Sequence, residues 1–113
     1  MSIQLPNLDD YLLHLKADNF SPETCYNYER DLHTFENFLS TDIKKQFDKL
    51  DKKDILRYKA FLHSSDRKTA NKNDIKQSLN SHSVNRILSA LRSYLKFLEE
   101  IEYNNISISA SSI

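Results

Sequence analysis

The fold is decided by the stretch SHSVNRILSALRSYLKFLEE, residues 81–100. Its apolar residues recur every three or four positions, which is the spacing of one face of an α-helix. They are Val84, Ile87, Leu88, Leu91, Leu95 and Leu98. The polar residues between them include two arginines and a lysine, and no acidic residue occurs before Glu99. The pattern predicts a helix over about residues 83–103 with one buried side and one basic side.

The polar side of this helix forms a continuous ridge. At 100° per residue, its members lie within about 100° of Asn85, opposite the apolar face. We call these residues the polar ridge: Asn85, Arg86, Ser89, Arg92, Ser93 and Lys96. Arginine and lysine neutralise phosphates, and asparagine and serine can bond base edges or phosphate oxygens. The ridge is therefore either a DNA-contacting surface or the solvated face of an amphipathic helix, and its own residues leave both interpretations open.

Three further helices are expected upstream. The first covers about residues 7–19, with Asn7 as its cap. The second begins with Ser21 as N-cap and Pro22 at the first helical position, and runs to about residue 40. The third, capped by Asp51, covers about residues 52–64. Residues 65–82 are polar and predict a long loop with room for a helical turn near residues 75–79. A chain without glycine is poorly suited to tight hairpins, so we predict an all-α fold, a compact four-helix bundle.

Composition and charge favour a single globular domain without a membrane-spanning segment. The 113 residues are enough for one domain, and the formal net charge is zero. Residues 1–40 hold two basic and seven acidic side chains, whereas residues 41–80 hold eleven basic and six acidic ones. No apolar run is long enough to span a membrane, and no signal peptide is recognisable. With Cys25 as the single cysteine, we expect a cytoplasmic protein without an internal disulfide and without a membrane partner.

The sequence offers no pattern typical of a metal or cofactor site. Its four histidines lie on separate segments, without the spacing of zinc ligands relative to one another or to Cys25. Asp9 and Asp10 are adjacent, so they cannot share a helix face as an acid–base pair. A glycine-rich phosphate loop is impossible in a chain with no glycine. We therefore expect no metal, no cofactor and no catalytic residue.

Two blocks of the sequence carry a resemblance to a known family. They are LDDYLLHLKADNFSPETCYNYERDLHTFENFL and SVNRILSALRSYLKFLEE, with LDKKDILRYKAFL between them. In this order and spacing they resemble the N-terminal core-binding domain of tyrosine recombinases, the phage-integrase and Xer-like family. The resemblance covers roughly residues 5–106. It implies a SAM-like four-helix bundle whose second and fourth helices face the major groove of a recombination half-site.

The resemblance also implies partners and site residues. The partners would be double-stranded DNA and other recombinase protomers, which act as a tetramer on DNA, while the isolated domain is expected to be monomeric. Residues expected to contact DNA are the polar ridge together with Ser21, Thr24, Tyr28, Lys68 and Lys72. Residues 1–106 would form the DNA-binding domain, and residues 107–113 would begin a linker towards a catalytic domain that this chain does not contain. The chain itself would then not be an enzyme, although its parent would be a recombinase.

A second hypothesis belongs to another class of function. A helical protein–protein interaction module would use the opposite charges of the first and middle thirds of the chain to join molecules. The two hypotheses differ in the role of the polar ridge, because only DNA binding requires its arginines.

Overall fold

The structure, a computed structural model, describes residues 3–64, 81–103 and 105–113, with only the backbone at residues 81 and 82. Its helices are α1 (Leu8–Ala17), α2 (Pro22–Phe38), the π-helix η1 (Leu39–Ile43), the 3₁₀ helix η2 (Phe47–Lys49), α3 (Lys52–His63), α4 (Ser81–Glu100) and the 3₁₀ helix η3 (Ala110–Ser112). The described residues include no strand. The predicted all-α, four-helix fold is confirmed. Residues 65–80 of the expected loop, with the helical turn predicted there, lie outside the described residues. Residues 81 and 82 were also expected in the loop, but they belong to α4, which begins two residues earlier than predicted.

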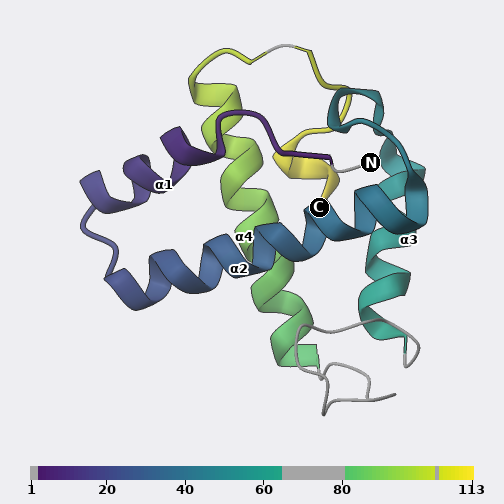
Figure 1. The fold of residues 1–113 in the computed structure, drawn as a ribbon, viewed down its shortest axis with the longest axis horizontal. Helices are drawn as coiled ribbons and strands as arrows, with labels where there is room; N and C mark the ends of the chain where they lie inside the picture. The colour runs from purple at the N-terminus through teal and green to yellow at the C-terminus, as the bar shows by residue number, and fades with distance from the viewer. Residues whose placement is uncertain (1–2, 65–80, 104) are drawn as a thin grey trace.

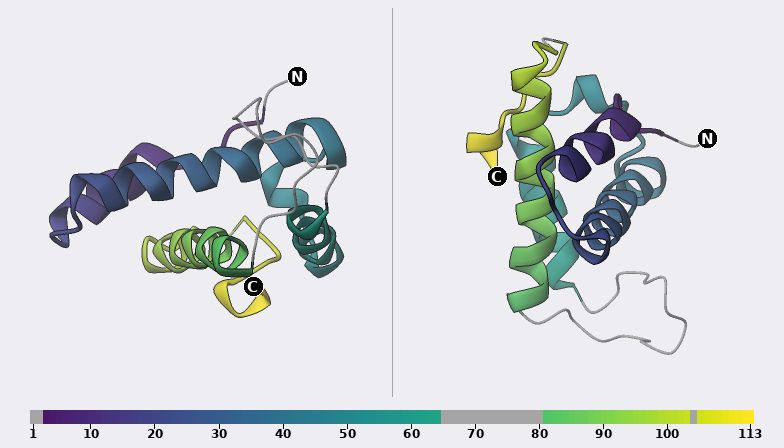
Figure 2. Two further views of the ribbon diagram at one scale, coloured as in Figure 1. Left: turned by 90° about the horizontal axis from the view of Figure 1, so that it is seen from below. Right: turned by 90° about the vertical axis from the view of Figure 1, so that its left-hand side faces the viewer.

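The helices are arranged around α4. Helix α2 crosses α4 on one side, α1 lies beside α2, and α3 lies near the other end of α2 (Figure 1). The C-terminal residues, including η3, pack against α4 on the side opposite to α2 (Figure 2). Helix α4 is therefore in contact with the rest of the protein on two sides, and part of its circumference stays exposed between them.

The starts of α2 and α3 follow local capping signals. The hydroxyl of Ser21 accepts a hydrogen bond from the Thr24 backbone N–H at 3.1 Å, and Pro22 occupies the first turn. Asp51 and Asp54 form a capping box at the start of α3. Both predicted caps are confirmed. Asn7 also precedes its helix, but its side-chain amide donates to the Asp10 carboxylate instead of accepting from the backbone. The expectation of a side-chain cap by Asn7 was wrong, because Asn7 adopts a left-handed conformation with φ 57°.

Three helix ends use a left-handed residue that is not glycine. The Phe20 N–H reaches back to the Leu15 carbonyl at 3.0 Å, with Asn19 at φ 64° between them. At the end of α4 the Tyr103 N–H bonds the Leu98 carbonyl at 2.9 Å, with Glu102 at φ 60°. Lys44, at φ 57°, closes η1 with a bond to Leu39. These bonds satisfy helix-terminal carbonyls, and they end α1 and α4 slightly earlier than predicted.

Residues of α1, α2, α3 and α4 meet in one buried core. Tyr11, Tyr58 and Tyr94 are fully buried. The Tyr11 and Tyr94 rings meet edge to face at 5.5 Å, and Phe35 meets Tyr58 in the same way at 4.8 Å. Such pairs add directional preference to apolar burial, so aromatic contacts help to fix how the helices cross.

Both ends of the chain pack on the bundle. The Leu5 N–H donates to Glu36 on α2 at 2.8 Å, and the Leu5 side chain is buried. At the other end Ile108 is buried, and the Ala110 N–H donates to Glu99 at 3.3 Å. Residues 105–113 thus lie against α4 and include the short turn η3. The assignment of residues 107–113 as the beginning of a linker, and the boundary at residue 106, stay predictions.

Candidate nucleic-acid interface

The structure divides the polar ridge of α4 into two sets. Asn85, Arg92 and Lys96 are exposed and Ser89 is partly exposed, and by helical geometry these four lie within about 40° of Asn85. We call these four residues the exposed ridge. Arg86 is also exposed and Ser93 partly exposed, but they lie about 80–100° further round the helix, where Arg86 contacts α2 and Ser93 contacts α1. Sequence reasoning placed all six on one polar face, whereas the fold uses the edge of that face for contacts between helices.

Arg86 joins α4 to α2 through an ion pair. Its Nε and Nη2 atoms each donate to a different carboxylate oxygen of Asp31, both at 3.2 Å. Asp31 is 2% exposed, whereas the Arg86 side chain is 43% exposed. Burial raises the pKa of the Asp31 carboxyl, and the hydrogen bonds and charge of Arg86, together with the Arg30 charge, oppose that rise without cancelling it. Arg86 is therefore the main partner of a buried acid.

Ser93 joins α4 to α1 in a similar position. The Tyr11 hydroxyl donates to its Oγ at 2.8 Å. Tyr11 is fully buried, and burial raises the pKa of its hydroxyl to about 12, so this hydroxyl stays protonated as a donor. The Ser93 oxygen is already engaged within the fold, which leaves it less available to a ligand than the four residues of the exposed ridge.

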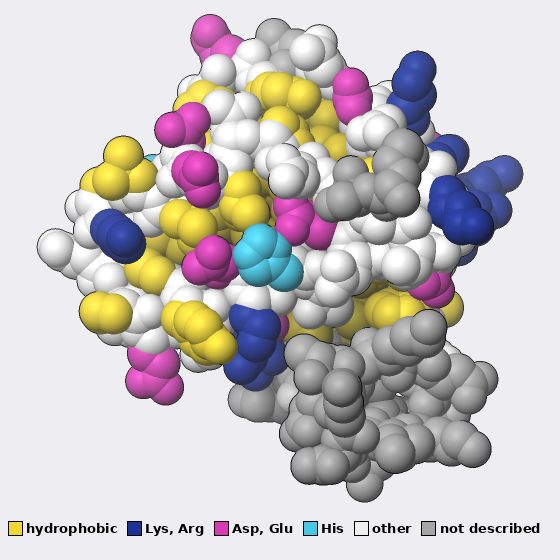
Figure 3. All heavy atoms as spheres, in the orientation of Figure 1, with side chains coloured by type: hydrophobic (Ala, Val, Ile, Leu, Met, Phe, Trp, Pro, Cys, Tyr) yellow, Lys and Arg dark blue, Asp and Glu magenta, His cyan; other side chains and the backbone are white. Residues whose placement is uncertain are grey.

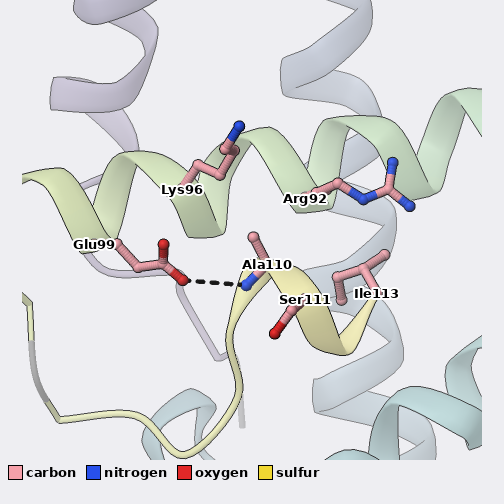
Figure 4. Close-up of a pocket in the computed structure, with 6 residues that line it drawn as sticks. All are labelled: Arg92, Lys96, Glu99, Ala110, Ser111 and Ile113. Atoms are coloured by element: carbon pink, nitrogen blue, oxygen red, sulfur yellow. Dashed lines mark hydrogen bonds between the residues drawn. The ribbon is translucent and has the colours of Figure 1, made fainter.

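The C-terminal residues border the other end of the exposed ridge. Arg92, Lys96 and Glu99 from α4 and Ala110, Ser111 and Ile113 from the tail line a shallow hollow of about 530 Å³. Figure 4 shows Arg92 and Lys96 projecting from α4 beside η3, with Glu99 bonded to the Ala110 N–H. Glu99 is the acidic residue nearest this basic pair along the helix, so the basic part of the exposed ridge ends within one turn of Lys96.

The start of α2 contains the other described residues predicted to contact DNA. The Ser21 hydroxyl donates to the Thr24 hydroxyl at 2.9 Å while it caps the helix. Tyr28 is partly buried, and its ring meets Phe20 edge to face at 6.2 Å. Ser21 and Thr24 thus form a small hydroxyl pair at the positive end of the helix dipole. Lys68 and Lys72 lie outside the described residues.

The outer face of α2 is acidic and holds a histidine. His33 lies between Glu36, 2.6 Å from its Nδ1, and Glu29, 3.5 Å from its Nε2. The Glu36 hydrogen bond raises the pKa of His33; burial lowers it to a smaller extent, and the charge of Glu36 and the contact with Glu29 raise it further. Figure 3 shows Asp and Glu side chains gathered over α1 and α2, with Lys and Arg mainly at the end near η1 and α3. This acidic face suits a polyanion poorly.

The described residues contain no other candidate chemistry. Among them, no three histidine, cysteine or acidic side chains are grouped so that they could hold a metal ion. Within the same ranges, no helix has the length and apolar character needed to cross a membrane. The groups that sequence reasoning missed are Asp31 and Tyr11, which hold Arg86 and Ser93. An acid on the inner side of α2, next to Leu32, was the available signal for the first.

Comparison with known families agrees with this fold. A family model for the phage integrase N-terminal SAM-like domain matches residues 8–101. The chain belongs to this family. The match begins at the first residue of α1 and ends one residue beyond α4, so this integrase-type domain includes α1, α2, α3 and α4. No curated protein and no solved structure gives a significant match. The resemblance inferred from the sequence is confirmed, and membership links the domain to site-specific recombination.

Proposed function

We propose that this domain binds duplex DNA within a site-specific tyrosine recombinase, with the exposed ridge of α4 in the major groove. The observation that carries the proposal is the position of Asn85, Ser89, Arg92 and Lys96 on the surface of α4, with no acidic residue among them. Arg92 and Lys96 would neutralise phosphates, and Asn85 and Ser89 would reach base edges or backbone oxygens. Family membership supports this assignment, because it connects the domain with recombination.

The start of α2 supplies a second contact in this proposal. The free N–H groups of a helix N-terminus and the nearby hydroxyls of Ser21 and Thr24 suit a phosphate. Tyr28 would lie at the edge of this contact, and Lys68 and Lys72 would add backbone contacts from the segment before α4. Ser93 is the weakest candidate, because Tyr11 already engages its hydroxyl.

The test is fluorescence anisotropy of a labelled duplex about three helical turns long, titrated at several salt concentrations. The main variant is Arg92→Ala combined with Lys96→Ala, which changes two exposed side chains. We expect weaker binding and a salt slope reduced by about 2, since each lost phosphate contact removes about 0.9. Arg86→Ala is a poor choice, because it would leave the buried Asp31 without its main partner.

The matched control is Lys52→Ala combined with Lys53→Ala, which removes the same charge from exposed positions at the start of α3. The proposal requires this control to bind almost like the parent. Equal losses of DNA affinity in both double variants would mean that the exposed ridge contributes only general positive charge and no specific contact. Absence of salt-dependent binding by the parent domain would remove the DNA-binding proposal altogether.

A second candidate function is association with other protomers of the recombinase. The acidic face of α1 and α2 favours it, since this face opposes basic side chains at the other end of the same molecule. In this proposal the parent acts as a tetramer on DNA, while the isolated domain is monomeric. Sedimentation of the domain with and without duplex distinguishes a monomer from an assembly of protomers. Self-association without DNA would favour the hypothesis of a helical protein–protein interaction module.

A further inference from the structure

The ion pair between Asp31 and Arg86 has an unusual distribution of exposure. The carboxylate is 2% exposed, and the arginine side chain that covers it is 43% exposed. The two residues come from α2 and α4, the two helices assigned to DNA, and stand 55 positions apart in the chain. The pair therefore lies where these two helices meet, with the Asp31 carboxylate buried and the Arg86 guanidinium at the surface.

The contact fixes the orientation of the guanidinium. Asp31 accepts from Nε and Nη2, which lie on one edge of the planar group, through two bonds of 3.2 Å. A fork of two bonds holds both the position and the plane of the group, which one bond cannot do. Arginine has five N–H donors in a rigid arrangement, so the donors that Asp31 does not use point away from the buried carboxylate.

Asp31 is itself held in place by its surroundings. It belongs to the interior of α2, and the Arg30 Nε lies 3.9 Å from its Oδ1. From α3, the fully buried Tyr58 is close enough for the Asp31 charge to contribute to the raised pKa of its hydroxyl. A side chain enclosed in this way has little freedom to follow a moving arginine, so it can act as a fixed support.

We propose that Asp31 is a positioning residue, which holds Arg86 with its outer edge directed to a phosphate of the DNA duplex. The inference rests on the proposed function and deepens it. Asp31 touches no DNA: one edge of the guanidinium binds the carboxylate, and the opposite edge donates to the phosphate. The same contact joins α2 to α4, so the two helices approach the duplex in a fixed relation.

The decisive variant is Asp31→Asn, because two physical effects predict opposite results. Removal of a negative charge near DNA should strengthen binding if the carboxylate acts only through its field. Loss of the fork should weaken binding, by about tenfold, if Asp31 positions Arg86; this is the scale of one charge-assisted hydrogen bond. We expect the tenfold loss in the anisotropy assay, with far-UV circular dichroism unchanged. A folded Asp31→Asn variant that binds as tightly as the parent, or more tightly, overturns the proposal.

The matched control is Glu29→Gln, the same change of charge on the outer face of α2. We expect this control to bind at least as well as the parent. Arg86→Lys supplies a second test should Asp31→Asn fail to fold. It keeps the charge but not the two-bond fork, and we expect a loss similar to that of Asp31→Asn. Parental affinity in Arg86→Lys would overturn the proposal. Failure of the proposed function would look different, because then the parent domain would show no salt-dependent binding.

Discussion

The Tyr58 hydroxyl is the one buried side-chain polar atom without a hydrogen-bond partner among the described residues. Its ring is fully buried against Phe35 at 4.8 Å, Phe38 at 4.9 Å and Phe61 at 6.2 Å. An unpaired buried hydroxyl costs about 1–3 kcal/mol relative to its solvated state. Tyr58→Phe keeps the ring contacts and removes only this atom. The void of one oxygen atom costs roughly a few tenths of a kcal/mol.

We therefore expect Tyr58→Phe to raise the free energy of unfolding by about 1 kcal/mol. With a urea m-value of about 2 kcal/mol/M, the midpoint of unfolding should rise by roughly 0.5 M. The measurement is equilibrium urea unfolding followed by circular dichroism, with m compared between variants. The matched control is Tyr11→Phe, whose lost hydroxyl donates to Ser93 at 2.8 Å, and which should lower stability by about 1 kcal/mol. A loss in Tyr58→Phe equal to that in the control would refute the reasoning, since it would mean that the hydroxyl is hydrogen-bonded in solution.

Two further predictions concern α2. Ser21→Ala should lower the free energy of unfolding by about 1 kcal/mol, because the helix loses its N-cap. The measurement is urea unfolding, with Ser107→Ala as a control at an exposed position. Equal midpoints of unfolding for the two variants would contradict the stabilising role of the cap. Glu36 and Glu29 raise the pKa of His33 above its ordinary 6.5 in the folded state, so protonation of His33 stabilises the fold. This contribution is complete below about pH 6.5 and is lost as pH rises through the raised pKa, so the stability difference between the parent and His33→Gln should shrink with rising pH. A difference that stays constant over that range would exclude the linkage.

The features that sequence reasoning recovered depend on neighbours along the chain. Ser21 with Pro22, and Asp51, signal helix starts from adjacent residues, and both caps are present. The apolar spacing of residues 81–100 identified the buried side of α4, but it left out the buried Ala90, Tyr94 and Phe97 and included Leu88, which is only partly buried. These signals are local, so one sequence is sufficient to read them.

The features that it missed depend on how the helices cross. Arg86 was grouped with the DNA-contacting residues, and the crossing of α2 and α4 is what brings Asp31 to it. Ser93 was grouped in the same way, although Tyr11, 82 positions away, donates to its hydroxyl. Periodicity assigns a residue to a face, but the crossing of the helices decides which part of that face is covered. The packing of residues 105–113 on α4 escaped prediction for the same reason.

The left-handed helix ends have a consequence for how this domain can change. In a chain with no glycine, Lys44 and Glu102 hold φ values of 57° and 60°. For residues with a Cβ atom that conformation costs roughly 1–2 kcal/mol each. Both side chains are exposed, and neither belongs to the exposed ridge. Replacing Lys44 or Glu102 with glycine would remove part of this conformational cost and so raise the stability of the domain. Both positions lie outside the candidate interface. A substitution that changes DNA specificity and also weakens the contact between α2 and α4 would lower the stability of the domain. Glycine at residue 44 or 102 would offset that loss without changing any residue of the exposed ridge.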